Sequence, residues 1–80
     1  MTRLTLYSKP GCHLCEAMKA VVDRVSQAMP IVVDEIDITT DAELNRRYER
    51  EIPVLLIDGR KAAKYCVTEA DLIRQIHARS

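Results

Sequence analysis

Lys9-Pro10-Gly11-Cys12-His13-Leu14-Cys15 is the segment in which this chain shows its chemistry, because it holds two cysteines three residues apart. A short apolar run at residues 4–7 precedes it and predicts a β-strand. Beyond it, apolar residues recur at helical spacing, at Leu14, Met18, Val21, Val22, Val25 and Met29. This spacing predicts an amphipathic helix that begins at the cysteines. A close cysteine pair between a strand and a helix is typical of a redox dithiol.

The position of the pair gives the two thiols different roles. Unpaired backbone N–H groups and the helix dipole favour negative charge at a helix start, so they should stabilise a thiolate at Cys12. Lys9 adds a positive charge nearby. Cys15 lies on the same helix face, close enough to form a small disulfide with Cys12. We therefore interpret Cys12 as the attacking thiolate, and Cys15 as the resolving thiol with the higher pKa.

Two other interpretations of the pair stay open. A zinc site needs about two further ligands, and the candidates Cys66, His13 and His77 do not form a second closely spaced pair. An iron–sulfur cluster that bridges two copies is a related metal-binding alternative. The second interpretation is a redox-inert adaptor protein in which the two thiols are buried.

Length and charge exclude several classes of function. Eighty residues are enough for one domain with a modest core, so residues 1–80 are taken as a single domain. Twelve basic and twelve acidic side chains cancel, which argues against binding of nucleic acid or of an anionic membrane. The chain has no apolar run of the ~20 residues that would span a bilayer. Met1-Thr2-Arg3 leads directly into the first strand, so we expect a cytoplasmic monomer without a signal peptide.

The rest of the chain predicts alternating strands and helices. Pro30 ends the first helix, and the β-branched run at 31–38 predicts a strand. Thr40 to Glu43 has the form of a capping box, which predicts a short helix with Thr40 as its N-cap. The apolar run at 54–57 predicts a buried strand, Asp58-Gly59 a tight hairpin, and 60–65 a polar edge strand. Thr68 is a plausible N-cap for a last helix with Leu72, Ile73 and Ile76 on one face.

The predicted order is β-α-β-α-β-β-α, an α/β fold with a four-stranded mixed sheet flanked by helices. With a dithiol at the first strand–helix junction and Pro53 before the third strand, this order resembles the thioredoxin superfamily. Tyr7-Ser8-Lys9-Pro10-Gly11-Cys12 is similar to the glutaredoxin branch. Cys12-His13-Leu14-Cys15 together with Ile52-Pro53-Val54-Leu55 resembles a group of small C-x-L-C glutaredoxin-like proteins.

The resemblance implies a thiol–disulfide oxidoreductase that acts on protein or small-molecule disulfides. It also implies a cis peptide bond before Pro53, which would lie against the dithiol beside Ile52 and contact an extended substrate. Lys9, His13 and Leu14 are further candidate substrate contacts, with Leu14 as apolar cover beside the dithiol. A typical glutaredoxin has Pro and Tyr in place of His13 and Leu14.

A second departure concerns glutathione. In glutaredoxins a Gly-Gly pair before the last helix lets the backbone approach this tripeptide. The matching segment, residues 65–68, has no glycine. We therefore expect no bound cofactor and poor use of glutathione as a co-substrate, with a thioredoxin-type system as the alternative recycling reductant. Cys66 lies in this segment. Its two alternatives are an off-pathway disulfide with the dithiol under oxidation and a buried, unreactive thiol, and we expect the second.

Overall fold

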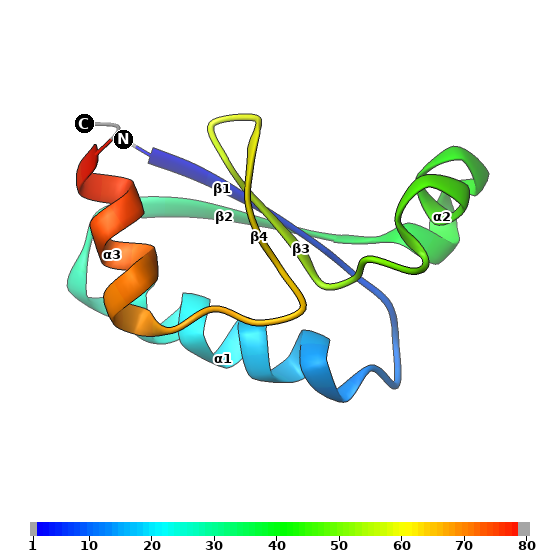
Figure 1. Cartoon of the computed structure of the whole chain (residues 1–80), viewed down its shortest axis with the longest axis horizontal. Helices are drawn as coiled ribbons and strands as arrows, with labels where there is room; N and C mark the ends of the chain where they lie inside the picture. The colour runs from blue at the N-terminus through cyan, green and yellow to red at the C-terminus, as the bar shows by residue number, and fades with distance from the viewer. Residues whose placement is uncertain (1, 79–80) are drawn as a thin grey trace.

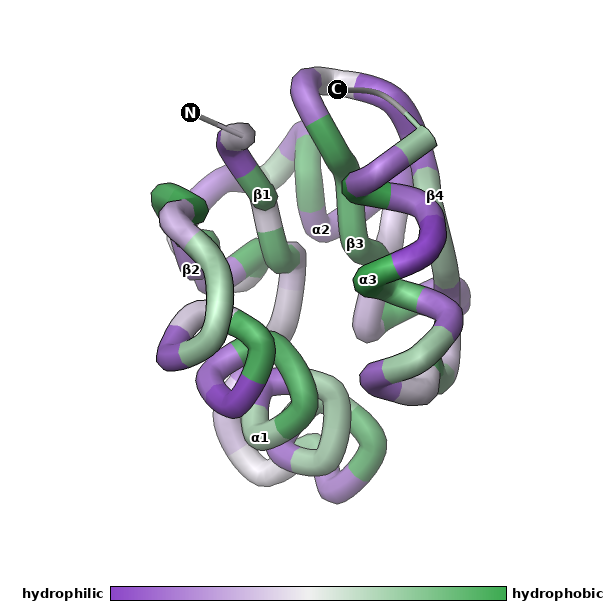
Figure 2. The backbone as a smooth tube through the Cα atoms, turned by 90° about the vertical axis from the view of Figure 1, so that its left-hand side faces the viewer, coloured by the Kyte–Doolittle hydropathy of each residue, from purple (hydrophilic) through white to green (hydrophobic). Residues whose placement is uncertain are grey.

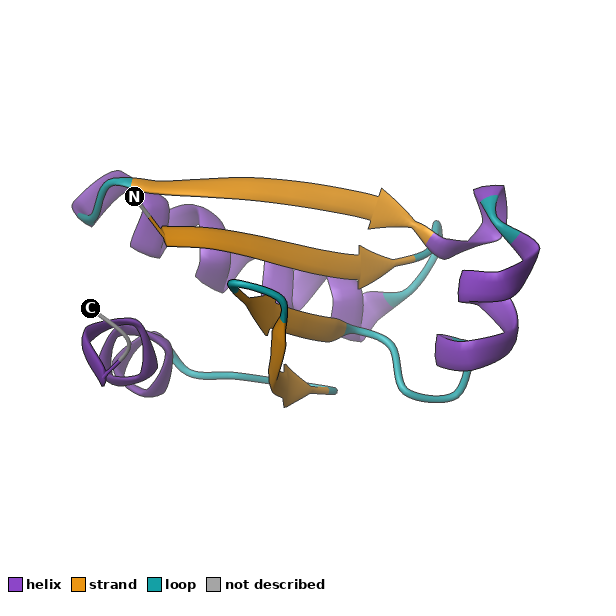
Figure 3. Cartoon of the chain, turned by 90° about the horizontal axis from the view of Figure 1, so that it is seen from above, coloured by secondary structure: helices purple, strands orange, loops and turns teal. Residues whose placement is uncertain are grey.

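The computed structural model describes residues 2–78, which form a four-stranded sheet and its covering helices. Strands β1 (Thr2–Ser8) and β2 (Ile31–Asp37) pair in parallel, and β3 (Val54–Ile57) runs antiparallel to β1. Strand β4 (Arg60–Lys64) pairs antiparallel with β3, so the spatial order is β2-β1-β3-β4. Figure 3 shows β1 and β2 pointing toward the same end of the molecule. The predicted mixed sheet is confirmed.

Helices α1 (His13–Ala28) and α3 (Glu69–Ala78) pack on the same face of the sheet. The shorter α2 (Ala42–Tyr48) lies beyond the ends of β1 and β2 (Figure 1). A short 3₁₀ helix, η1 (Ile38–Thr40), joins β2 to α2. None of the helices within residues 2–78 is both long and apolar enough to cross a membrane.

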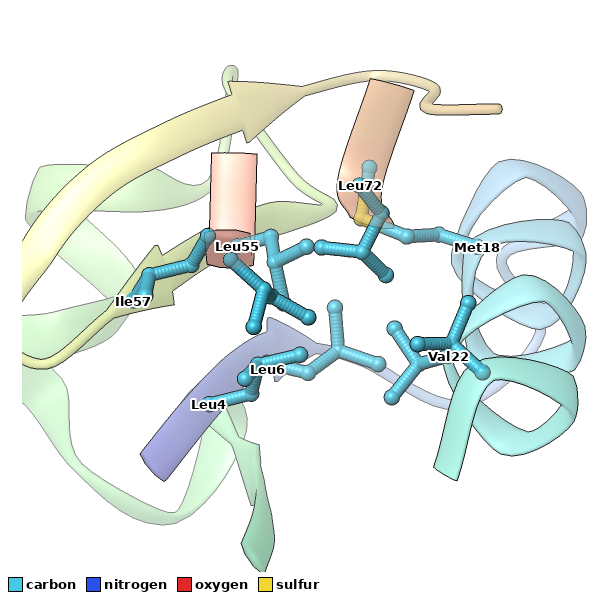
Figure 4. Close-up of a cluster of buried hydrophobic side chains, with 9 residues drawn as sticks. Leu4, Leu6, Met18, Val22, Leu55, Ile57 and Leu72 are labelled. Carbon is cyan, nitrogen blue, oxygen red and sulfur yellow. The ribbon is translucent and has the colours of Figure 1, made fainter. Parts of the chain in front are cut away.

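The main core lies between this sheet face and the two longer helices. Figure 4 shows leucine and isoleucine side chains of β1 and β3 directed toward Met18 and Val22 of α1 and Leu72 of α3. Figure 2 shows hydrophobic residues along β3, and hydrophobic residues that alternate with hydrophilic ones along α1. Burial of each of these side chains stabilises the folded state by roughly 1.5–3 kcal/mol. The packed core holds β1 against α1, and so fixes the loop between them that carries the cysteines. Its fully buried members are Leu4, Leu6, Val22, Leu55, Ile57 and Leu72.

Short sequence features predicted the ends of several helices and strands correctly. Asp58 and Gly59 have φ of 49° and 85°, as a two-residue hairpin turn requires. The Asp71 N–H donates to the Thr68 hydroxyl at 3.1 Å, which confirms Thr68 as a cap of α3.

The predicted capping box at Thr40 is wrong by one residue. Asp41 is the N-cap of α2, and its carboxylate accepts from the N–H groups of Glu43 and Leu44. Thr40 belongs to η1 instead, and its hydroxyl donates to the Asp37 carbonyl. Strand β2 ends at Asp37, one residue before the predicted strand end. The cause is that the Asp37 carboxylate accepts from the Thr39 N–H and so starts η1 at Ile38.

Candidate active site

The loop between β1 and α1 places Cys12 at the start of the helix. Gly11 has φ of 78°, a conformation that glycine adopts without steric cost. Cys12 follows in an extended conformation as the N-cap of α1. Its sulfur accepts a hydrogen bond from the Cys15 N–H, with 3.2 Å between sulfur and nitrogen. The sequence predicts Cys12 at this helix start, where N–H groups lack partners within the helix and the dipole favours an anion.

Cys15 lies in the first turn of α1, with 4% of its surface exposed. Burial raises the pKa of its thiol from 9.0 to about 11, and the hydrogen bond with Cys12 adds to this effect. A hydrogen bond with the Lys9 backbone and the Lys9 charge act in the opposite direction. The pKa of the Cys15 thiol therefore lies above the ordinary value of a cysteine. Both cysteines are free thiols in this structure.

A small apolar cluster, separate from the main core, lies around the dithiol. Its buried members are Cys15, Ile38 and Ile52. Cys12 packs against them, as do Tyr7 and Tyr48, whose rings stack with centroids 4.7 Å apart and planes 16° apart. The Arg47 guanidinium carbon lies 5.3 Å from the Tyr48 ring centroid. The cluster therefore joins α2 to the start of α1. Both lie at the same end of the molecule (Figure 1).

The segment between α2 and β3 reaches the same cluster through Ile52. Pro53 is buried, and the peptide bond between Ile52 and Pro53 is cis. The Pro53 carbonyl accepts from the Tyr65 N–H at 2.9 Å. The structure thus brings Ile52 into the apolar cluster of the two cysteines, although it is about forty residues away in sequence.

Comparison with known proteins agrees with this geometry. The family model of the Glutaredoxin-like domain (DUF836) matches residues 3–77. The chain belongs to this family. No curated protein matches the sequence.

Solved structures resemble this glutaredoxin-like chain over most of its length. Protein XcR50 from X. campestris is 28% identical, with a TM-score of 0.78 over 94% of this chain and 96% of that one. Protein Ne2328 from Nitrosomonas europaea is 25% identical, with a TM-score of 0.77 over 92% of this chain and 89% of that one. Chloroplastic thioredoxin z is 14% identical but has a TM-score of 0.82 over 98% of this chain and 77% of that one. This last likeness shows the thioredoxin fold alone.

Three sequence-predicted contacts of this glutaredoxin-like protein lie on its surface. Lys9 and His13 are exposed next to Cys12. Leu14 has the spacing of the apolar face of α1, but 51% of its surface is exposed. Within the first turn of α1, only Cys15 is buried.

The expectation of a buried Cys66 is also wrong. Cys66 is exposed, because β4 ends at Lys64 and the chain crosses to α3 on the surface. Tyr65, just before it, has 42% of its surface exposed. Residues 65–68 therefore present side chains at the position where glutaredoxins carry their glycines.

A hollow of about 280 Å³ adjoins the buried cysteine on the side of β2. It carries both signs of charge, and a Lys19–Glu35 ion pair of 3.7 Å crosses from α1 to β2. Hydrogen bonds from the hydroxyl and N–H of Thr39 hold the pKa of Asp37 below its usual range. The lining residues are Ser8, Lys9, Pro10, Gly11, Cys15, Glu16, Lys19, Glu35 and Asp37.

The metal-binding alternative requires several ligand side chains that lie close together in the folded chain. Within the part of the chain that the structure describes, no three His, Cys, Asp or Glu side chains are grouped so that they could hold a metal ion. His13 and Cys66, which the sequence offered as candidates, do not complete such a group with the dithiol. His77 lies in the last turn of α3, in the opposite part of the fold.

Sequence reasoning missed the aromatic part of the site. Tyr7 and Tyr48 are forty-one positions apart in sequence, and no motif links them. Tyr7 ends the apolar run before the dithiol, and Tyr48 is the last residue of α2. Knowledge of the strand register, which pairs Tyr7 with Ile36 and Val54, would have been needed to bring the two rings together.

Proposed function

We propose that this protein is a thiol–disulfide oxidoreductase in which Cys12 attacks and Cys15 resolves. The observation that carries this proposal is the asymmetry of the pair. Cys12 lies at the helix start and accepts a backbone hydrogen bond, whereas Cys15 is buried and keeps its proton. A thiolate is the nucleophile in disulfide exchange, and the protonated thiol waits for the second step.

The reaction has two exchange steps. The Cys12 thiolate attacks one sulfur of a substrate disulfide, and a Cys12–substrate disulfide forms as the substrate S–S bond breaks. The departing substrate thiolate takes up a proton. Cys15 then loses its proton and attacks the Cys12 sulfur, which releases the second substrate thiolate. The substrate disulfide is reduced to two thiols, and the dithiol is oxidised to a Cys12–Cys15 disulfide.

The surface around Cys12 is the proposed docking site for the substrate. Exposed Lys9, His13 and Leu14 form one side of it, with a positive charge and an apolar side chain. The buried Ile52-Pro53 segment supports the other side from beneath, because Ile52 packs with the dithiol cluster. We infer that protein or small-molecule disulfides bind there without a bound cofactor, and that the protein works as a cytoplasmic monomer. A thioredoxin-type system serves better than glutathione as the recycling reductant.

A redox titration tests this function. The Cys66→Ser variant is equilibrated in buffers with increasing ratios of oxidised to reduced dithiothreitol, and free thiols are then alkylated and counted by mass. Cys12 and Cys15 should lose their thiols together, at one midpoint. A redox-inert adaptor would show no defined midpoint. Protein purified without oxygen that carries stoichiometric zinc or an iron–sulfur absorbance would favour the metal-binding alternative.

A further inference from the structure

Tyr65 has a backbone conformation that large side chains rarely adopt. Its φ is 72°, and the Cys66 N–H donates to the Lys64 carbonyl across it at 2.9 Å. This is a three-residue turn of the positive-φ type, which is rare and strained. Within residues 2–78, the other non-glycine residue with positive φ is Asp58, where the hairpin turn requires it. Tyr65 has no such requirement, and glycine would adopt this φ at lower cost.

Tyr65 makes two hydrogen bonds to the segment that leads into β3. Its N–H donates to the Pro53 carbonyl at 2.9 Å, and its phenol donates to the Arg50 carbonyl at 3.2 Å. The side chain therefore reaches across the segment from one end to the other. The ammonium of Lys64 lies 5.5 Å from the centroid of its ring.

Strand β4 holds the middle of the same segment. The carboxylate of Glu51 accepts from the Lys61 ammonium at 3.1 Å and lies 3.6 Å from that of Lys64. These contacts hold the pKa of Glu51 below its usual range, the hydrogen bond from Lys61 most of all. The segment at 50–53 is thus attached to β4 and Tyr65 at three of its four residues.

The fourth residue of the segment, Ile52, connects it to the dithiol. Ile52 is buried in one cluster with Cys15, against which Cys12 also packs. Any shift of the segment would move this side chain relative to the two sulfurs. The contacts of Tyr65 therefore act, through Ile52 and Pro53, on the proposed docking surface.

We propose that Tyr65 is a positioning residue, whose phenol and backbone hold the segment at 50–53 in the place where an extended peptide disulfide docks beside Cys12. This inference rests on the proposed function and adds a residue that determines substrate affinity. A purely structural role explains Tyr65 poorly. Tyr65 has 42% of its surface exposed, so it buries limited apolar area, and its φ favours glycine. The specific contribution of tyrosine at this position is the phenol contact to Arg50.

The Tyr65→Phe variant tests the proposal, since it removes the phenol but keeps the ring and backbone. The substrates are a synthetic peptide with one intramolecular disulfide and the small disulfide dithiobis-nitrobenzoate. We expect KM for the peptide to rise about two- to tenfold, the effect of one lost hydrogen bond. The kcat for the peptide, the KM for the small disulfide and the reduction potential of the dithiol should stay unchanged.

Two further variants separate positioning from stability. Arg24→Gln removes an exposed contact of similar kind, the 2.9 Å pair with Glu69 between α1 and α3, and should leave KM for the peptide unchanged. Tyr65→Gly suits the backbone but removes the ring, so it should fold and raise KM at least as much as Tyr65→Phe. Unchanged KM for the peptide in both Tyr65 variants, with or without a lower unfolding midpoint, would overturn the proposal.

Hydrogen exchange gives a measurement that does not depend on activity. The N–H groups of Glu51 and Ile52 donate to the Tyr48 carbonyl, at 2.8 and 3.0 Å. Their exchange should be faster in Tyr65→Phe than in wild type, with the amides of α3 unaffected. If the wild-type protein reduces neither substrate, the proposed function is wrong, and exchange then decides whether Tyr65 holds the segment. Equal exchange in both proteins would show that it does not.

Discussion

The backbone N–H of Cys15 donates to the sulfur of Cys12 over 3.2 Å. The residue proposed to resolve the mixed disulfide therefore also provides a hydrogen bond to the attacking sulfur. Because the donor is a backbone group, it persists when the Cys15 side chain is replaced. The two roles of Cys15 can thus be separated by mutation.

Substitution of each cysteine should have a different result. Cys12→Ser should abolish disulfide reduction, since it removes the nucleophile. Cys15→Ser should keep the backbone donor and a reactive Cys12, and it should accumulate substrate as a Cys12 mixed disulfide. Alkylation at mildly acidic pH in a Cys66→Ser background, read by peptide mass, should label Cys12 before Cys15. Prior labelling of Cys15 would show that the assignment is reversed.

The raised pKa of Cys15 predicts a loss of stability at alkaline pH. Because the folded state holds this proton more tightly, the stabilisation is complete below pH 9 and is lost as pH rises toward about 11. The loss amounts to roughly 2–3 kcal/mol at most. Denaturant unfolding of the reduced protein at pH 8, 9, 10 and 11 measures it. Cys15→Ser has no such proton to lose, and parallel curves for the two proteins would contradict the expectation.

The elements predicted correctly from the sequence depend on a few neighbouring residues. The start of α1 at Cys12, the hairpin at Asp58-Gly59 and the cap of α3 at Thr68 are local features of this kind. The capping box failed because two acceptors competed within five residues. Asp37 drew the Thr39 N–H into η1, which left Asp41 in the position to cap α2.

The corrected cap gives a stability prediction. Asp41→Ala should lower the free energy of unfolding by about 0.5–2 kcal/mol, because the carboxylate satisfies two N–H groups at the start of α2. Thr40→Ala removes a hydrogen bond to the Asp37 carbonyl and should cost less. Chemical denaturation of both variants measures the difference. A larger loss in Thr40→Ala would restore the capping box that the sequence suggests.

The site was predicted less completely than the fold, because its contacts join distant parts of the chain. The cysteines and Ile52-Pro53 have recognisable motifs, and the structure places Ile52 in their cluster. The stack of Tyr7 on Tyr48 and the bond of Tyr65 to the Arg50 carbonyl depend on strand register and on the end of β4. Neither arrangement has a signature in the sequence.

Exposure of Cys66 predicts oxidation between molecules. An accessible thiol forms disulfides more readily than a buried one, and Cys66 is on the surface. Air oxidation of the wild-type protein should give a disulfide-linked dimer that dissociates in reductant, whereas Cys66→Ser should stay monomeric under the same treatment. Non-reducing electrophoresis measures this. A dimer of equal amount in Cys66→Ser would place the linkage at the dithiol instead.

The last prediction concerns glutathione, whose use is expected to be poor. Close approach of a ligand to the backbone favours glycine, but residues 65–68 carry side chains, with Tyr65 and Cys66 exposed. We expect slow reduction of a glutathione mixed disulfide in a glutathione-coupled assay, and faster turnover with a thioredoxin-type system. The double variant Tyr65→Gly/Cys66→Gly should increase the glutathione-coupled rate, since it opens this surface. Efficient use of glutathione by the wild-type protein would contradict the prediction. It would mean that the N-terminus of α3, which favours anions, binds the tripeptide despite these side chains.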